Sequence, residues 1–442
     1  MSAPAATPPP SLTWLHLCPG ECSLVFDENT PGWVVQQASR FDERGARIGV
    51  HWNANEVRLA DDEAGCVMIN SRVSEKQAKG LGLSYVRRFA VIPNLREARW
   101  FIPLDCGAVS AAAFSLYTPA RRSAKIKRAL IQAAARLPGG FWYRDHLLVA
   151  LREPPGIEKT LAPLFSEPIR LALSCGAPEG ARNRKASALA IDRRGNLRAF
   201  VKLARSEIAR EIVAHEAAML PGLAHIRAPR LLLNEEIDGT LVMVQTPLPG
   251  STAPLAFGPA HAAFLQSLRS PEMILAAQSP MIQRLRQRLD HPAMHGLSEI
   301  LMDLMPSLEQ MSVPVTIVHG DFAPWNLRIE GGAISAFDWE YGQLSGLPLV
   351  DEIHYRLQVG LLLEHWSAHR GAEEIEKLCQ SRPQGLSSEN AATLAIVYLL
   401  DMLARLLAEG YGEEHEMIIW HRAVLGHLMS RRTSSAKEVA VA

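Results

Sequence analysis

The chain has 442 residues, of which 48% are hydrophobic, and it carries 46 basic and 46 acidic side chains. This balance gives no global positive field, so the composition excludes a general nucleic-acid-binding protein. The charged fraction of 21% is typical of a globular chain, and the length predicts two or three folding units.

Residues 1–10 are rich in Ala and Pro and have no basic region followed by an apolar run, so they predict a disordered tail instead of a signal peptide. The most apolar helical stretch, Leu394–Leu407, contains Asp401 and Arg405 and is shorter than the roughly 20 residues that span a bilayer. The six cysteines are scattered and predict reduced thiols. We therefore predict a cytoplasmic protein without a transmembrane segment.

Residues 11–165 predict an N-terminal α/β domain of unknown role. Two strand-like runs with a turn between them predict a hairpin, Tyr85–Ile92 and Arg99–Leu104. Further strand-like runs are Val57–Leu59, Cys66–Ile69 and His146–Leu151. Helical patterns cover Val109–Tyr117 and Ser123–Leu137, and each stops before a proline.

A basic run, Arg121–Arg128, lies at the start of the second of these helical patterns. One interpretation is a weak contact with a phosphorylated or membrane surface. The other is the solvated face of an ordinary amphipathic helix. The sequence alone leaves both open.

Residues 166–245 change to a pattern of short strands around one helix. The predicted strands are Ile169–Ser174, Ser187–Ile191, Leu197–Leu203, Arg230–Asn234 and Leu241–Val244, and the helix is Ile208–Leu220. The loop after the first strand holds Gly176 and Gly180, where backbone N–H groups could bind phosphates. Lys202 lies among apolar residues in the third strand, a position that requires a partner. Glu211 and Glu216 on the helix are the candidates.

Residues 246–430 are predominantly helical, and residues 431–442 predict a disordered tail. The predicted helices are Pro259–Leu268, Pro280–Leu289, Leu297–Met305, Val350–Trp366, Glu373–Cys379, Glu389–Ala408 and Glu416–Met429. Between the third and fourth helices, the apolar run Val313–Val318 leads into His319-Gly320-Asp321. Asn326 follows Asp321 by five residues and Asp338 follows Asn326 by twelve. Three such oxygen-bearing side chains suit a hard divalent cation and a hydroxyl nucleophile.

The stretch from His319 to Asn326, followed by Asp338-Trp339-Glu340-Tyr341, resembles the catalytic core of the aminoglycoside phosphotransferase and choline kinase family. The resemblance implies an α+β, bilobal protein-kinase-like fold over about 165–430. This fold would have a five-stranded N-lobe at 166–245 and a helical C-lobe at 246–430, with the N-terminal α/β domain as an addition.

The same resemblance implies ATP and Mg²⁺ as cofactors. Asp321 would be the catalytic residue that accepts or orients the proton of the hydroxyl. His319 would be structural, and Asp351 would brace the catalytic loop through backbone N–H groups. Asn326 and Asp338 would bind the metal. Lys202, paired with Glu216, and the glycines Gly176 and Gly180 would bind the nucleotide phosphates. The adenine would be bound by Gln245, Thr246 and Leu248.

Two residues favour a small-molecule kinase over a protein kinase. Asp338 is followed by Trp339 and not by Phe-Gly, and Gly320 stands where protein kinases carry Arg. The implied activity is transfer of the γ-phosphate to a hydroxyl of a small molecule such as a sugar, amino sugar or amino alcohol, with a link to polysaccharide metabolism. The alternative is a nucleotide-binding, pseudokinase-like scaffold whose N-terminal domain binds a protein partner.

Overall fold

The computed structural model describes residues 10–18, 22–38, 45–116, 122–137, 143–175, 185–291, 294–381 and 385–441. The chain divides into two compact units. Unit 1 comprises Met1–Ala217 and Pro229–Pro247, and unit 2 comprises Ala218–Ala228 and Leu248–Ala442. The predicted start of the C-lobe at residue 246 lies within two residues of the start of the main part of unit 2.

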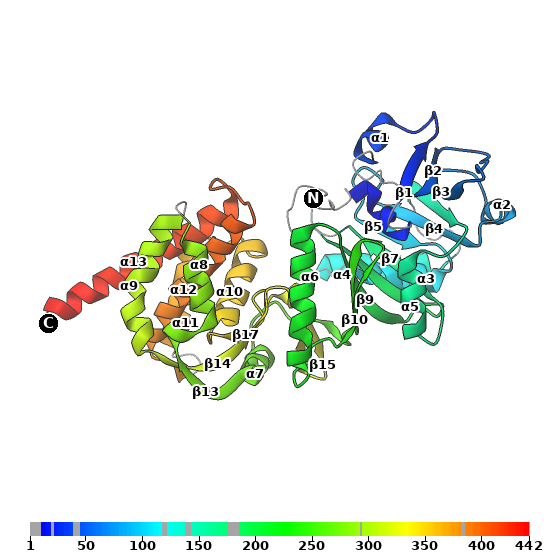
Figure 1. The fold of residues 1–442 in the computed structure, drawn as a ribbon. Coiled ribbons are helices and arrows are strands. Elements are labelled where there is room, and N and C mark those ends of the chain that lie inside the picture. The colour runs from blue at the N-terminus through cyan, green and yellow to red at the C-terminus, as the bar shows by residue number, and fades with distance from the viewer. Residues whose placement is uncertain are drawn as a thin grey trace. The chain divides into compact units, whose positions relative to one another are not determined.

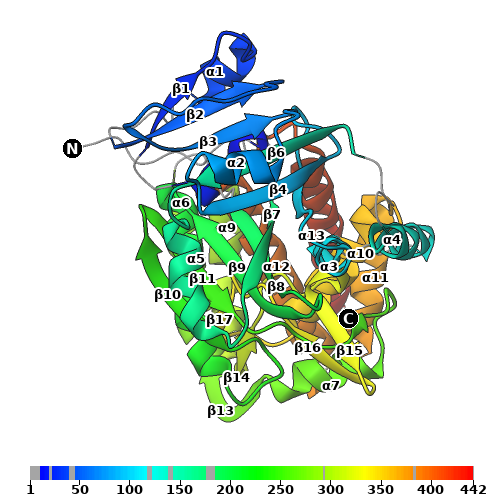
Figure 2. The ribbon, with the colours of Figure 1, turned by 90° about the vertical axis from the view of Figure 1, so that its right-hand side faces the viewer.

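Within the described residues, unit 1 is built on one sheet of eleven strands in the order β1-β2-β3-β6-β4-β5-β7-β8-β9-β11-β10 (Figure 2). The pairs β1–β2 and β2–β3 are parallel, and the others are antiparallel. The bounds are β1 Cys22–Phe26, β2 Ala46–Trp52, β3 Glu63–Ile69, β4 Tyr85–Ile92, β5 Trp100–Pro103, β6 Asp145–Leu151, β7 Ile169–Ser174, β8 Ala186–Asp192, β9 Leu197–Ala204, β10 Leu231–Ile237 and β11 Thr240–Gln245.

The predicted N-terminal domain and the predicted N-lobe share this one sheet. β5 pairs with β7 through Trp100 opposite Ser174 and Phe101 opposite Leu173. A single buried cluster also joins side chains from both parts, such as Val149 and Val201. Shortly before the predicted boundary at residue 165, the sequence Pro154-Pro155-Gly156 starts a short helix, α5 (Gly156–Leu161), with Pro155 as its N-cap. The two parts are therefore one structural unit.

Both faces of the sheet are covered, because successive residues of a strand point to opposite sides. On β3, Val67 and Ile69 join the main cluster with a 3₁₀ helix (Pro10–Leu17), α1 (Gly32–Ala38) and α5. Cys66 and Met68 face a second cluster under α2 (Glu75–Gly80). A third cluster lies under α3 (Gly107–Ala113) and α4 (Arg122–Ala135).

Most of the predicted N-terminal elements are present. The hairpin is β4–β5, and His146–Leu151 corresponds to β6. Val57–Leu59 is not a strand: Val57 and Leu59 are loop residues that pack against the second cluster. The strands β1 and β2 were not predicted. β2 alternates buried Ile48 and Val50 with small or polar residues, a pattern too short to stand out.

The five strands predicted for the N-lobe are β7, β8, β9, β11 and β10, which occupy one half of the sheet in that order. The predicted helix is α6 (Glu207–Met219), labelled in Figure 1. The protein-kinase-like, mixed α and β organisation predicted for this region is thus confirmed. Gly176 and Gly180 lie outside the described residues.

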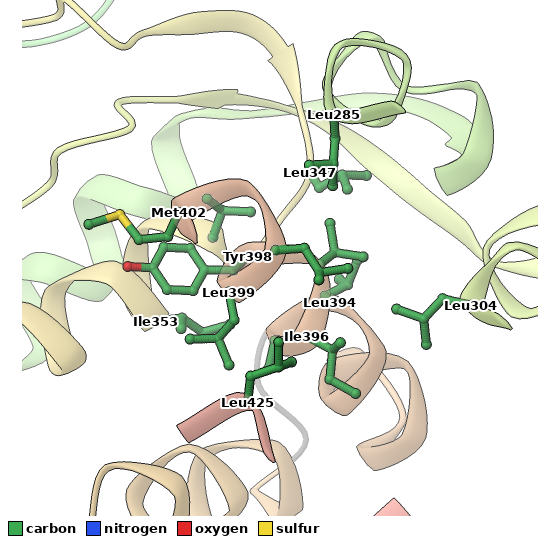
Figure 3. Packing of buried hydrophobic residues seen from close by; sticks show 14 of the residues in the cluster. Leu285, Leu304, Leu347, Ile353, Leu394, Ile396, Tyr398, Leu399, Met402 and Leu425 are labelled. Atoms are coloured by element: carbon green, nitrogen blue, oxygen red, sulfur yellow. The ribbon is translucent and has the colours of Figure 1, made fainter. Parts of the chain in front are cut away.

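Unit 2 is a helical assembly with its core around α12, whose residues include some of the largest buried side chains of the main cluster. Figure 3 shows how residues of four helices and the segment after β17 meet there: Leu394, Leu399 and Met402 of α12, Ile353 of α10, Leu304 of α9, Leu425 of α13 and Leu347. The bounds are α7 Pro259–Ser267, α8 Pro280–Leu289, α9 His295–Gln310, α10 Val350–Leu362, α11 Ala368–Gln380, α12 Ser388–Ala408 and α13 Glu416–Val441.

Two small antiparallel sheets frame the stretch His319–Asn326 in unit 2. The first joins β13 (Arg269–Leu275), which was not predicted, β14 (Ser312–Val318) and β17 (Gln343–Gly346). The second joins β12 (Ser251–Thr252), β15 (Leu327–Glu330) and β16 (Ala333–Ala336). β14 leads directly into His319. Gly331 and Gly332 have φ of 57° and 81° and form the tight turn between β15 and β16.

Two helices near the C-terminus differ from the sequence expectation. α12 is the one described helix long and apolar enough to cross a membrane, and 72% of its apolar window is buried inside the structure, as in a core helix. α13 continues to Val441, where the sequence predicted a disordered tail from residue 431. No Gly or Pro follows Gly426, so nothing in the local sequence ends that helix.

Because β5 pairs with the edge of β7, truncating the buried ring of Phe101 on β5 should destabilise all of unit 1. We expect Phe101→Ala, at a position that is 0% exposed, to lower the free energy of unfolding by about 3–5 kcal/mol. Leu232→Ala, at a position 38% exposed on β10, should cost well under half of that. Urea unfolding followed by tryptophan fluorescence measures both. Equal small losses would contradict a shared core.

Candidate functional site

A buried ion pair lies on one face of the unit 1 sheet. The Nζ of Lys202 on β9 donates to the Oε2 of Glu216 on α6, and the two side chains are 2% and 0% exposed. Val201 and Leu203, on either side of Lys202, point to the opposite face and join the main core. Glu211, the other candidate partner, is exposed. Desolvation offsets most of the attraction in such a pair, so stability alone gives little reason for it.

Three residues are predicted to bind adenine through backbone N–H groups, and one of these N–H groups is already bonded within the protein. Gln245 ends β11 and is buried. The N–H of Thr246 donates to the carbonyl of Arg230 at 2.9 Å, and its hydroxyl accepts from the Arg230 N–H at 2.9 Å. Thr246 therefore continues the strand pairing instead of presenting its N–H to a ligand. Leu248, the third residue, is half-buried and belongs to unit 2.

A single buried carboxylate holds the loop that carries Asp321 in unit 2. Asp351, at the start of α10, accepts the N–H of His319 at 2.7 Å and the N–H of Gly320 at 2.9 Å. Burial raises the pKa of Asp351, while the two N–H groups and His319 act in the opposite direction. The structure thus gives Asp351 the contacts of a loop brace. Its role is to fix backbone, because both of its oxygens are bonded to main-chain groups.

The His319 ring links the loop to the segment that carries Asp338. Its Nδ1 accepts the N–H of Asp321 at 3.2 Å, so the proton of the neutral ring resides on Nε2. Nε2 then donates to the carbonyl of Phe337 at 3.0 Å. The ring is 0% exposed and lies 4.5 Å from the ring of Trp339, centroid to centroid. His319 is therefore placed to position the loop, and not to exchange protons with a ligand.

Gly320 is required by its surroundings. Its φ is +79°, and a Cβ there would lie 2.5 Å from the carbonyl oxygen of Tyr341. Such a contact is with backbone, so no side chain fits without moving the Tyr341 segment. The Arg that protein kinases carry at this place is excluded here on steric grounds, which agrees with the resemblance to small-molecule kinases.

The Asp321 carboxylate is held at both oxygens and remains partly open. Oδ1 accepts from Nε2 of His354 at 2.9 Å, and Oδ2 accepts from Nδ2 of Asn326 at 2.8 Å, while the side chain stays 26% exposed. Burial raises the pKa of Asp321, but the hydrogen bond and charge of His354, then Arg405 and His319, outweigh it and hold the pKa below its ordinary value. Asp321 is therefore ionised, fixed in orientation and accessible.

Asn326 presents its amide oxygen away from Asp321. Its Nδ2 donates both to the Asp321 carboxylate and to the Asp321 carbonyl, at 2.8 and 3.0 Å. Because the oxygen and nitrogen lie on opposite sides of the amide carbon, Oδ1 faces the other way and can act as a metal ligand. The Asn326 carbonyl also accepts the N–H of Phe337 at 3.0 Å, which places Asp338 one residue from this bond.

Asp338 combines an unusual backbone with a carboxylate neighbour. Its φ is +69°, a conformation that costs a non-glycine residue of the order of 1–3 kcal/mol and is found chiefly at functional sites. A carboxylate oxygen of Asp338 lies within 4.8 Å of one of Glu340. Oxygen-only ligands at this spacing suit Mg²⁺, which retains several waters and few protein ligands.

Three residues at this site were not predicted from the sequence: His354, Tyr398 and Arg405. The Tyr398 hydroxyl lies 3.0 Å from Nδ1 of His354, whose side chain is 1% exposed. Nη1 of Arg405 donates to the Gly320 carbonyl at 2.8 Å, and its guanidinium lies 4.3 Å from the centroid of the Tyr341 ring. His354 follows Asp351 by three residues on the same helix, and this spacing could have marked it in the sequence. No such local spacing marks Tyr398 or Arg405.

Comparison with known proteins finds a family that part of the chain resembles. Residues 176–382 match the phosphotransferase enzyme family. The resemblance predicted from the sequence is confirmed, and the match supports a small-molecule phosphotransferase. The search of curated proteins found no match for the chain.

Three solved structures illustrate what the chain is similar to. Choline kinase LicA from Streptococcus pneumoniae has 15% identity over 63% of this chain and 98% of its own, with a TM-score of 0.42. Aminoglycoside phosphotransferase APH(4)-Ia has 15% identity over 62% and 97%, with a TM-score of 0.41. A putative fructosamine-3-kinase from Haemophilus somnus has 14% identity over 62% and 96%, with a TM-score of 0.39.

The contacts of Asp321 predict a measurable change in its titration. In His354→Leu the donor to Oδ1 is lost while burial remains, so the pKa of Asp321 should rise and the carboxylate should protonate at higher pH than in the wild type. Carboxyl ¹³C NMR across an acid titration measures this directly. In His354→Gln the side-chain amide retains an N–H donor, so the pKa of Asp321 in this variant should lie below its pKa in His354→Leu. An unchanged pKa in His354→Leu would contradict the assigned contact.

Proposed function

We propose that the protein is an ATP- and Mg²⁺-dependent phosphotransferase that transfers the γ-phosphate to a hydroxyl of a small molecule. The observation that carries the proposal is the Asp321 carboxylate, which is ionised, fixed at both oxygens and 26% exposed. A scaffold that only bound nucleotide would gain nothing from an oriented, accessible carboxylate at this place.

In this proposal each residue acts through a group whose position the structure gives. Asp321 orients the acceptor hydroxyl and accepts its proton while the hydroxyl oxygen bonds to the γ-phosphorus and the bond from that phosphorus to the oxygen of the leaving ADP breaks. The amide oxygen of Asn326 and the carboxylate of Asp338 would hold Mg²⁺, which would neutralise charge on the phosphate oxygens. Lys202, kept in place by Glu216, contacts the nucleotide phosphates. Gln245 and Leu248 are the remaining candidates for the adenine, since the Thr246 N–H is engaged.

The low pKa of Asp321 fits phosphoryl transfer better than strong base catalysis. In a loose transition state the hydroxyl retains its proton until late, so the carboxylate is needed chiefly to align the oxygen with phosphorus. A weakly basic, always ionised Asp does this over a wide pH range. The His354 and Asn326 donors that lower its basicity also fix its plane.

We propose an acceptor among sugars, amino sugars and amino alcohols, and a cytoplasmic location where ATP is available. Acidic side chains of unit 2 are the groups that could bind the amino group of such an acceptor, and two of them already have partners. Glu352 is 8% exposed and paired with Arg356 at 2.8 Å. Glu413 is paired with Arg422 at 2.7 Å. These two acids therefore give no support for a cationic acceptor over a neutral one.

The proposed role of Asp321 is tested by measuring phosphorylated product. Mg-ATP is supplied with a panel of sugars, amino sugars and amino alcohols, and product is followed by mass spectrometry for wild type and Asp321→Ala. We expect turnover with one acceptor class and a loss of roughly 10²–10⁴-fold in the variant. Full activity in Asp321→Ala would refute the role. Nucleotide binding without product from any acceptor would favour the scaffold alternative.

Two acids on α6, Glu216 and Glu211, provide a matched pair of variants. In Glu216→Gln, the buried Lys202 loses the carboxylate that its Nζ contacts, so stability should fall by about 3–5 kcal/mol and the thermal stabilisation by Mg-ATP should be lost. Glu211→Gln removes an exposed acid from the same helix, and both quantities should stay close to wild type. Differential scanning fluorimetry with and without Mg-ATP distinguishes them. Equal effects of the two substitutions would exclude the assignment of Glu216.

A further inference from the structure

Helix α4 presents apolar side chains on the side where a surface helix normally presents polar ones. Ile126 and Leu130 lie one turn apart and are 62% and 67% exposed, and Leu137, just beyond the helix, is 64% exposed. Among the large hydrophobic residues that the structure describes, these three are the most exposed. Single exposed apolar side chains are ordinary, but two on one helix with a third just beyond its end are not.

The opposite side of α4 attaches the helix to the body of unit 1. Ala135 is 3% exposed and, with Ile131, belongs to the cluster under α3 and α4. Nε2 of Gln132 donates to the carbonyl of Ala111 on α3 at 3.1 Å. At about 100° per residue, Ala135 lies roughly 140° around the helix from Leu130. The apolar stripe therefore faces away from the part of unit 1 that supports the helix.

The charge around α4 is of one sign. Between Asp105 and Asp145 the sequence contains seven Lys and Arg residues and no Asp or Glu, although the whole chain is neutral. Lys127 flanks the stripe and is exposed, as are Arg136 and Arg144. An exposed apolar stripe between basic flanks is the pattern of a helix that lies in the interface of a membrane.

We propose that α4 is a docking surface for an anionic lipid membrane. Ile126 and Leu130 would enter the boundary between headgroups and acyl chains, while the basic side chains remain at the level of the phosphates. A second copy of this chain is a poorer occupant, because two such helices would bring like charges together. Aliphatic side chains offer no ring for stacking on bases, so a nucleic acid fits the stripe poorly too.

The strength of the contact between α4 and a membrane follows from its apolar and basic side chains. Two or three aliphatic side chains contribute only part of the free energy needed for stable binding, and each basic residue near an anionic surface adds about a fivefold factor. The contact should therefore be reversible and salt-sensitive, and it should require anionic lipid.

Co-sedimentation with lipid vesicles tests the proposal on the full chain without nucleotide. We expect the wild type to sediment with vesicles of phosphatidylcholine and phosphatidylglycerol, and to remain soluble with vesicles of phosphatidylcholine alone or in high salt. The double variant I126S/L130S should lose binding, since both positions face away from the core. Lys127→Gln should weaken it by roughly fivefold. Met302→Ser is the matched control, because Met302 is 56% exposed on α9 in unit 2.

Several outcomes would overturn the proposal. It fails if the wild type does not sediment, if it sediments equally with uncharged vesicles, or if Met302→Ser loses binding as the double variant does. Light scattering after size-exclusion chromatography tests whether a second copy of the chain covers the stripe instead of a membrane. A dimer that I126S/L130S abolishes, without vesicle binding by the wild type, would assign the stripe to a second copy of the chain.

Discussion

Two backbone N–H groups bonded to one buried carboxylate set the geometry of the catalytic stretch. Asp351 holds His319 and Gly320, and His319 in turn orders Asp321 and the Phe337 carbonyl. The same helix supplies His354 one turn later, which binds the Asp321 carboxylate. Because α10 is packed into the core around α12, the position of the Asp321 carboxylate follows from ordinary apolar packing several residues away.

The arrangement of unit 1 shows how a kinase-like lobe can be enlarged without a new interface. An edge strand carries unpaired N–H and C=O groups, and proteins must cover or block it. Here β5 covers β7, and the sheet continues into six strands that precede the lobe. The ion pair of Lys202 and Glu216 lies on the half of the sheet that belongs to the lobe. The added strands therefore extend the sheet beyond β7, and β8 separates that joint from Lys202 on β9.

The sequence was informative where function depends on neighbours along the chain. Asp321, Asn326 and Asp338 stand close together and were predicted as a group, and Lys202 was marked by its apolar neighbours. Glu216 shares a helix face with the buried Val213 and Ala217, so the 3.6-residue period would have separated it from the exposed Glu211. The pairing of β5 with β7, and the approach of Tyr398 and Arg405 to the loop, join segments far apart in the sequence. No local pattern encodes such contacts.

The joint between β5 and β7 has a consequence for how unit 1 can open. β7 ends at Ser174, and its last two residues pair with β5. The next residue, Cys175, donates its N–H to the carbonyl of Arg99 at 3.0 Å. Opening of the N-terminal strands would leave the end of β7 unpaired, so the two halves of the sheet share one local stability.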